Sequence, residues 1–177
     1  KKDFSLDGEF HDKYTDTLSR EYKELVWVLF IDDKELPEKY DKNIIFISKK
    51  ASLVYLFLNI FDDIKNKFFL TDEEPEINTL SSNFKKYKAL RDTIKNLIKD
   101  NPINLVFTSY EAHTYQVGIF NYINKKFKNL ITVGYIHSAL PPLPTEYFYR
   151  EGSPKLLLTH GNYQKKILVD FLNWKEE

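Results

Sequence analysis

The chain contains no cysteine and no methionine, and only five of its 177 residues are glycine. Without cysteine it can form no disulfide, no zinc-thiolate site and no thiol nucleophile. Acidic and basic side chains number 26 each, so there is no basic excess to neutralise nucleic-acid phosphates. The longest apolar stretch, residues 53–70, is interrupted by charged and amide side chains and is unsuited to spanning a membrane.

What is present indicates a folded domain. Hydrophobic residues make up 42% of the chain and aromatic residues 16%, which excludes disorder. The length suits one domain over residues 1–177, with residues 1–20 as an irregular leader that could form a short helix near 14–22. No secretory signal pattern opens the sequence, so the expected compartment is the cytoplasm.

Continuous apolar runs predict strands that are buried on both faces. They occupy residues 24–31, 43–48, 104–108, 129–135 and 155–159. Between and after these runs, helical periodicity covers residues 51–69, 79–100, 114–127 and 161–174, with Thr79 as an expected N-cap. Strands that alternate with helices predict an α/β fold: a Rossmann-like three-layer sandwich whose mostly parallel sheet carries helices on both faces.

Polar side chains follow the last three predicted strands. In an open parallel sheet, ligands bind beyond the carboxyl ends of the strands. The residues found there are Tyr110, Glu111 and His113 after 104–108, His137 and Ser138 after 129–135, and His160 and Gly161 after 155–159. Three of the four histidines thus lie at one predicted sheet edge, where they could act as acid or base, or only hydrogen-bond the neighbouring loops.

The common cofactor motifs are missing. The dinucleotide fingerprint Gly-x-Gly-x-x-Gly does not occur, nor does a phosphate loop that ends in Gly-Lys-Ser or Gly-Lys-Thr. The histidines have no metal-ligand spacing, so we expect no metal. Gly161 could let backbone approach an anion at a helix start, or could simply form a turn.

Three stretches that end in these polar residues, 108–111, 133–138 and 154–161, carry a family resemblance. Together with the helices between them, they resemble the amino-terminal domain of GT-B glycosyltransferases. The likeness is to bacterial enzymes that build capsule, lipopolysaccharide or teichoic acid. It covers the chain from about Pro102 to its end.

The resemblance implies transfer of a sugar from a nucleotide sugar to a hydroxyl acceptor. In this interpretation His137 removes the acceptor proton, and Glu111 either orients and charges His137 or is itself the base. The other residues at that edge, His113, His160, Ser138, Tyr110 and Gly161, would bind substrate. A second domain, reached through a linker that starts at residues 175–177, would hold the nucleotide, and no other cofactor is implied.

The acceptor would be a saccharide or a lipid-linked molecule, which implies peripheral association with the inner face of the cytoplasmic membrane. Two alternatives remain open at this point. One is half of a sugar-nucleotide epimerase, which shares the architecture. The other is a non-catalytic Rossmann-like domain that binds a partner protein or a regulatory ligand.

Overall fold

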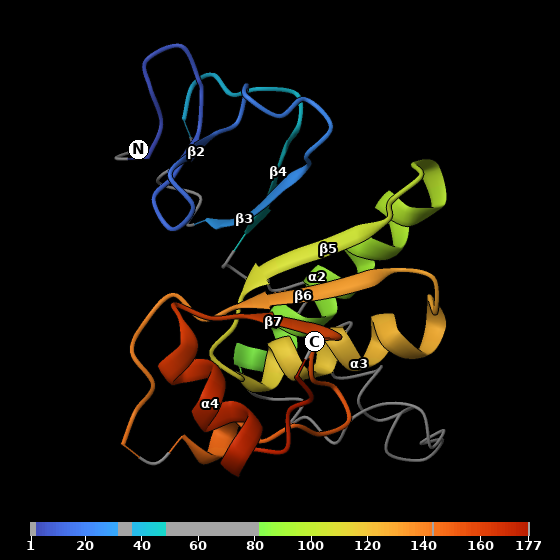
Figure 1. Cartoon of the computed structure of the whole chain (residues 1–177). Coiled ribbons are helices and arrows are strands. Elements are labelled where there is room, and N and C mark those ends of the chain that lie inside the picture. Colours follow the sequence, from blue (N-terminus) through green and yellow to red (C-terminus); the bar gives the residue numbers. More distant parts are fainter. Residues whose placement is uncertain (1–2, 32–36, 49–81, 143, 177) are drawn as a thin grey trace. The chain divides into compact units, whose positions relative to one another are not determined.

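The computed structural model describes residues 3–31, 37–48, 82–142 and 144–176. The chain divides into two compact units, Lys1–Lys65 and Asn66–Glu177, which we call the amino-terminal and carboxy-terminal units. Each is described by itself (Figure 1). The helix predicted over 51–69 and the predicted N-cap Thr79 lie outside the described residues.

The amino-terminal unit begins with a small antiparallel hairpin instead of an irregular leader. Strands β1 (His11–Asp12) and β2 (Thr17–Leu18) pair with each other. The expected helix near 14–22 is wrong, because the carboxylate of Asp12 accepts hydrogen bonds from the Tyr14 N–H and the Thr15 hydroxyl. Such local bonds offer the backbone a turn in place of a helix.

Two parallel strands lie further along the described part of this unit, as the apolar runs predict. Strand β3 (Trp27–Ile31) pairs with β4 (Ile44–Ser48) in parallel, with Trp27 opposite Ile44. The ring of Phe10 lies 5.4 Å from that of Trp27, centroid to centroid, in an edge-to-face arrangement. The hairpin region is therefore packed onto the strands through aromatic contacts.

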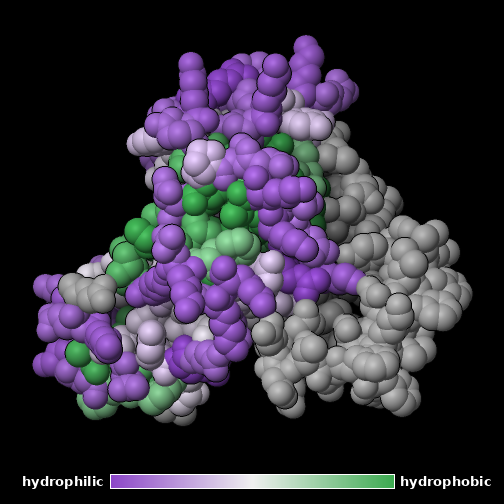
Figure 2. All heavy atoms as spheres, turned by 90° about the vertical axis from the view of Figure 1, so that its right-hand side faces the viewer, coloured by the Kyte–Doolittle hydropathy of each residue, from purple (hydrophilic) through white to green (hydrophobic). Residues whose placement is uncertain are grey.

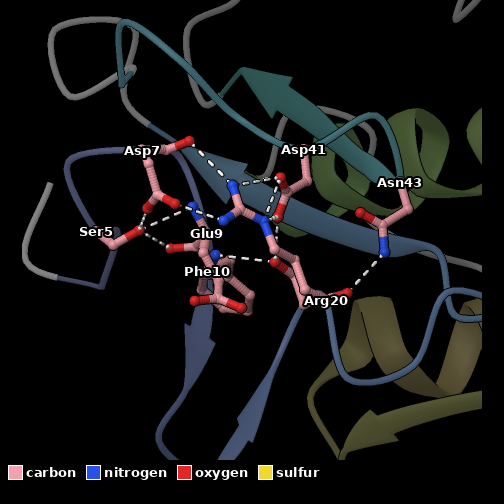
Figure 3. Close-up of polar contacts among 8 residues, drawn as sticks. Ser5, Asp7, Glu9, Phe10, Arg20, Asp41 and Asn43 are labelled. Atoms are coloured by element: carbon pink, nitrogen blue, oxygen red, sulfur yellow. Dashed lines mark hydrogen bonds and ion pairs between the residues drawn. The ribbon is translucent and has the colours of Figure 1, made fainter.

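A polar network centred on Arg20 joins Asp7 to Asp41 within the amino-terminal unit (Figure 3). Its guanidinium donates to Asp41 from Nε at 2.9 Å and to Asp7 from Nη1 at 2.5 Å. The hydroxyl of Ser5 and the guanidinium of Arg20 lower the pKa of Asp7 to about 2. The fully buried Ser19 donates to Asp41 as well, so the Asp41 carboxylate binds two adjacent residues, Ser19 and Arg20, and Arg20 in turn links it to Asp7.

The carboxy-terminal unit is an α/β structure built on three parallel strands. Their order is β5-β6-β7, with bounds Leu105–Ser109, Ile131–Tyr135 and Leu156–Leu158. The helices described are α2 (Ser82–Asp100), α3 (Thr114–Lys126) and α4 (Asn162–Phe171), with a 3₁₀ turn at Thr145–Tyr147. The predicted strands and helices of this part are confirmed. Helix α4 ends before the expected Trp174, and the left-handed φ of +62° at Asn173 redirects the chain there.

The two faces of this sheet differ. Side chains alternate between the faces of a strand, and Val106 and Leu157 pack against a core formed by all three helices. On the other face Val133 in the central strand is buried, but five side chains around it are exposed by 37 to 49%, namely Leu105, Phe107, Ile131, Leu156 and Leu158. Hydrophobic side chains are visible at the surface among hydrophilic ones in Figure 2. Helices on both faces therefore stay a prediction.

Candidate functional site

Strand register brings the predicted site residues to one edge. The last register positions of the three strands are Ser109, Tyr135 and Leu158. Two residues beyond each of them come Glu111, His137 and His160. The Tyr110 N–H donates to the Tyr135 carbonyl at 2.8 Å, and the Ile136 N–H donates to that of Leu158 at 3.0 Å, so the ladder continues past the strands. The chain thus delivers a carboxylate and two imidazoles to the carboxyl end of the sheet.

Glu111 lies between two of the three histidines at this edge. Its Oε2 is 2.8 Å from His113 Nε2, and its Oε1 is 3.2 Å from His137 Nε2. Both distances lie within ion-pair range, and the pairing is ionic when the imidazoles are protonated. The predicted meeting of Glu111 and His137 is therefore present, and His113 completes a three-residue cluster that we call the Glu111 cluster.

The three side chains of the Glu111 cluster differ in how much of their surface is exposed to solvent. The side chains of Glu111 and His113 are 38% and 53% exposed, whereas that of His137 is only 19% exposed. The Nδ1 atom of His137 is buried, and its Nε2 faces the carboxylate. A proton from an incoming hydroxyl can thus reach Glu111 more directly than it can reach His137.

Two tyrosines lie within electrostatic range of the same carboxylate. Burial, with the charge of Glu111 adding to it, raises the pKa of Tyr147 to about 12. The same two causes, in the same order, raise the pKa of Tyr115. Both phenols are therefore neutral near neutral pH and can donate a hydrogen bond. The backbone of Tyr147 is held separately, because its carbonyl accepts a hydrogen bond from the Trp174 indole N–H at 2.7 Å.

The sequence analysis missed Gln116, which holds the loop that carries Glu111. Its Oε1 accepts the N–H groups of Glu111 at 3.0 Å and His113 at 3.1 Å, and its Nε2 donates to the Ser109 carbonyl at 2.7 Å. A glutamine three residues after a helix N-cap is half of a capping-box pattern, and this was the available signal.

The remaining predicted site residues lie outside the Glu111 cluster. His160 pairs through Nε2 with the Tyr135 hydroxyl at 3.2 Å, and the Ser138 carbonyl accepts from Gln164 Nε2 at 3.0 Å. Gly161 is the N-cap of α4, and its φ of +140° is one that side-chain-bearing residues rarely adopt.

Tyr110 requires a correction. Its side chain is 1% exposed and packs near the rings of Phe120 and Tyr147, with centroids 5.7 and 6.0 Å away. It belongs to the core and offers no solvent-facing surface to a substrate. The expected substrate-binding role is therefore replaced by a packing role beneath the loop of Glu111.

An apolar pocket of about 500 Å³ lies beside α4. Its lining includes Leu140, Pro142, Tyr163, Ile167 and Phe171. It is near Ser138, because Gln164 both lines it and bonds the Ser138 carbonyl, but no member of the Glu111 cluster contributes to its wall.

The described part of the chain contains no group of three or more metal-ligating side chains arranged to hold a metal ion. Within those same residue ranges, no helix combines the length and the apolar character that crossing a membrane requires. No family model, curated protein or solved structure matches the chain.

Proposed function

We propose that this chain is the acceptor-side domain of a glycosyltransferase that moves a sugar from a nucleotide sugar to a hydroxyl group. The observation that supports this most is the Glu111 carboxylate held between His113 and His137 beyond the carboxyl ends of parallel strands. A partly exposed carboxylate with two imidazole partners is suited to accept a proton.

In the proposed reaction Glu111 is the general base. The acceptor hydroxyl gives its proton to the Glu111 carboxylate while its oxygen bonds to the anomeric carbon of the donor. The bond from that carbon to the nucleotide phosphate breaks, and the electron pair leaves with the phosphate. His137 contacts the carboxylate through Nε2 and orients it, and the more exposed His113 is the second imidazole partner of the base.

The proposed partners are a nucleotide sugar and a saccharide or lipid-linked acceptor of bacterial surface carbohydrate. Because such donors are cytoplasmic, we place the reaction in the cytoplasm, at the inner face of the membrane for a lipid-linked acceptor. We also propose the three-layer Rossmann-like sandwich as the architecture, which the parallel pairing within each unit supports. No metal or further cofactor enters this proposal.

A non-catalytic interaction domain is the second candidate. The observation that favours it is the row of exposed apolar side chains on one face of the β5-β6-β7 sheet. Exposed apolar patches commonly mark surfaces that bind partners. Under this alternative, replacing the members of the Glu111 cluster leaves function intact, whereas a charge at Phe107 abolishes it.

The test is sugar transfer by the full gene product with a panel of nucleotide sugars. We expect Glu111→Gln to reduce the rate by roughly 10²- to 10⁴-fold, the usual contribution of a general base. We expect His137→Ala to reduce it as well, because the base then loses the partner that orients it. His11→Ala is the matched control, because His11 lies in the amino-terminal unit and pairs with the exposed Asp16. Transfer at the wild-type rate by both cluster variants would refute the assignment.

A further inference from the structure

Gln116 is among the most buried polar side chains that the structure describes, with 2% of its surface exposed. It occupies the third position of α3 and reaches back across the preceding loop. Both ends of its amide are used: the oxygen accepts two backbone N–H groups, and the nitrogen donates to the last residue of β5. One side chain therefore ties together the end of a strand, Glu111 and the start of a helix.

The loop between β5 and α3 needs such a restraint. Ala112 has a φ of +53°, a left-handed conformation that is unfavourable for a residue with a side chain. It lies between Glu111 and His113, so its backbone sets how these two side chains approach each other. The amide oxygen of Gln116 binds the N–H on each side of Ala112 and thereby stabilises this conformation.

We infer that Gln116 is a positioning residue for the Glu111 cluster. This rests on the proposed function, in which Glu111 is the base. In these bonds Gln116 contacts only backbone groups. It therefore acts by fixing the backbone positions from which the side chains of Glu111 and His113 extend. Displacing a catalytic group by about 1 Å can cost roughly 100-fold in rate, and this is the expected scale of its effect.

Helix α4 uses the same arrangement. Gln164, also at the third helical position, accepts the His160 N–H at 3.0 Å and donates to the Ser138 carbonyl at 3.0 Å. The loops after β6 and β7 are thus joined by a glutamine, as the loop after β5 is restrained by Gln116. The recurrence favours a role in fixing the loops at this edge over a chance contact.

Two variants of the full gene product test the role. Gln116→Met keeps the side chain's length and removes all three hydrogen bonds, so we expect kcat/KM to fall roughly 100-fold. Gln116→Glu keeps an acceptor for the two N–H groups but loses the donor and adds a negative charge near Glu111. We expect a smaller loss, with the acidic limb of the pH–rate profile moved to higher pH.

A readout that does not depend on transfer separates this inference from the proposed function. The imidazole NMR signals of His113 and His137 should shift or broaden in Gln116→Met, while that of His11 stays unchanged. Thr132→Val is the matched control for general destabilisation, because it removes two hydrogen bonds of the same unit away from this loop. Loss of transfer in that control equal to the loss in Gln116→Met would show a merely structural effect.

The outcomes are distinct. Unchanged His113 and His137 signals in a folded Gln116→Met variant overturn the inference, whatever the activity. If Gln116→Met does not fold, a Gln116→Glu variant with wild-type signals and an unshifted pH profile overturns it. Shifted signals together with wild-type transfer uphold the positioning of the side chains and overturn the role of Glu111 as the base. A wild-type gene product that transfers no sugar overturns the proposed function and leaves the positioning to be read from the signals.

Discussion

Thr132 lies at the centre of a buried polar junction in the carboxy-terminal unit. It is fully buried in β6, where its hydroxyl donates to Asn124 Oδ1 of α3 and accepts the Lys155 N–H, both at 2.9 Å. Asn124 in turn donates from Nδ2 to the Ser153 carbonyl at 3.0 Å. One hydroxyl therefore joins a helix, the central strand and the segment that enters β7.

Replacing Thr132 with valine keeps the shape and removes the hydroxyl. Two hydrogen bonds, each contributing about 1 kcal/mol net, are lost, and the Asn124 carbonyl and the Lys155 N–H must find other partners. Because Asn124 is only partly buried and Lys155 is exposed, we expect a total loss of about 2 to 4 kcal/mol in the free energy of unfolding. This corresponds to a fall of roughly 10 °C in melting temperature for a unit of this size.

The assay is urea unfolding followed by the fluorescence of Trp174. The chain has two tryptophans, and a Trp27→Phe background leaves Trp174 as the reporter for the carboxy-terminal unit. Thr132→Ser is the matched control, because it keeps the hydroxyl and loses one methyl group, for a cost of about 1 kcal/mol. A Thr132→Val variant as stable as Thr132→Ser would refute the reasoning.

Three further predictions concern packing and pH. Gly134→Ala should cost about 1 to 3 kcal/mol by calorimetry, since an added Cβ would lie 2.9 Å from both the Tyr110 Cβ and the Pro154 ring. The depressed pKa of Asp7 means that its ionised form stabilises the fold, so stability that is present above pH 4 should be lost as the pH falls toward 2. Acid titration followed by circular dichroism should show this loss in the wild type and less of it in Asp7→Asn. The raised pKa of Tyr147 means that the folded state favours the neutral phenol, so stability should be lost as the pH rises from 10 through 12. In alkaline denaturation experiments, Tyr147→Phe should not show this part of the pH dependence.

The parallel strands were predictable from continuous apolar runs, but the expected burial on both faces is wrong for side chains such as Phe107 and Leu158, which are exposed. Helices α3 and α4 follow from the periodicity of their apolar residues and the chain breaks around them. The hairpin at residues 11–18 was not predictable in this way. Its strands are two residues each, and the Asp12 side chain, not an apolar pattern, decides the turn. A polar stretch with few apolar residues has no clear hydrophobic periodicity from which its strands could be predicted.

The meeting of Glu111 and His137 was also predictable, because residues equally far past the ends of neighbouring parallel strands lie side by side. The directions of the individual side chains were not predictable from the sequence. Tyr110 and Glu111 are adjacent in sequence, yet the side chain of Tyr110 is in the core and that of Glu111 contacts two histidines. The left-handed turn at Ala112 and its restraint by Gln116 set these directions. The capping-box spacing of Gln116 is a local signal, but it does not encode the left-handed turn that the glutamine restrains.

The central claim is that Glu111 and His137 act as one proton-transfer unit, and a double-mutant cycle tests it most directly. The measurement is kcat/KM for sugar transfer by the wild-type gene product, Glu111→Gln, His137→Ala and the double variant. Residues that act as a unit are strongly non-additive, so the account predicts a double variant within about tenfold of the slower single variant. Losses that multiply in the double variant would contradict it.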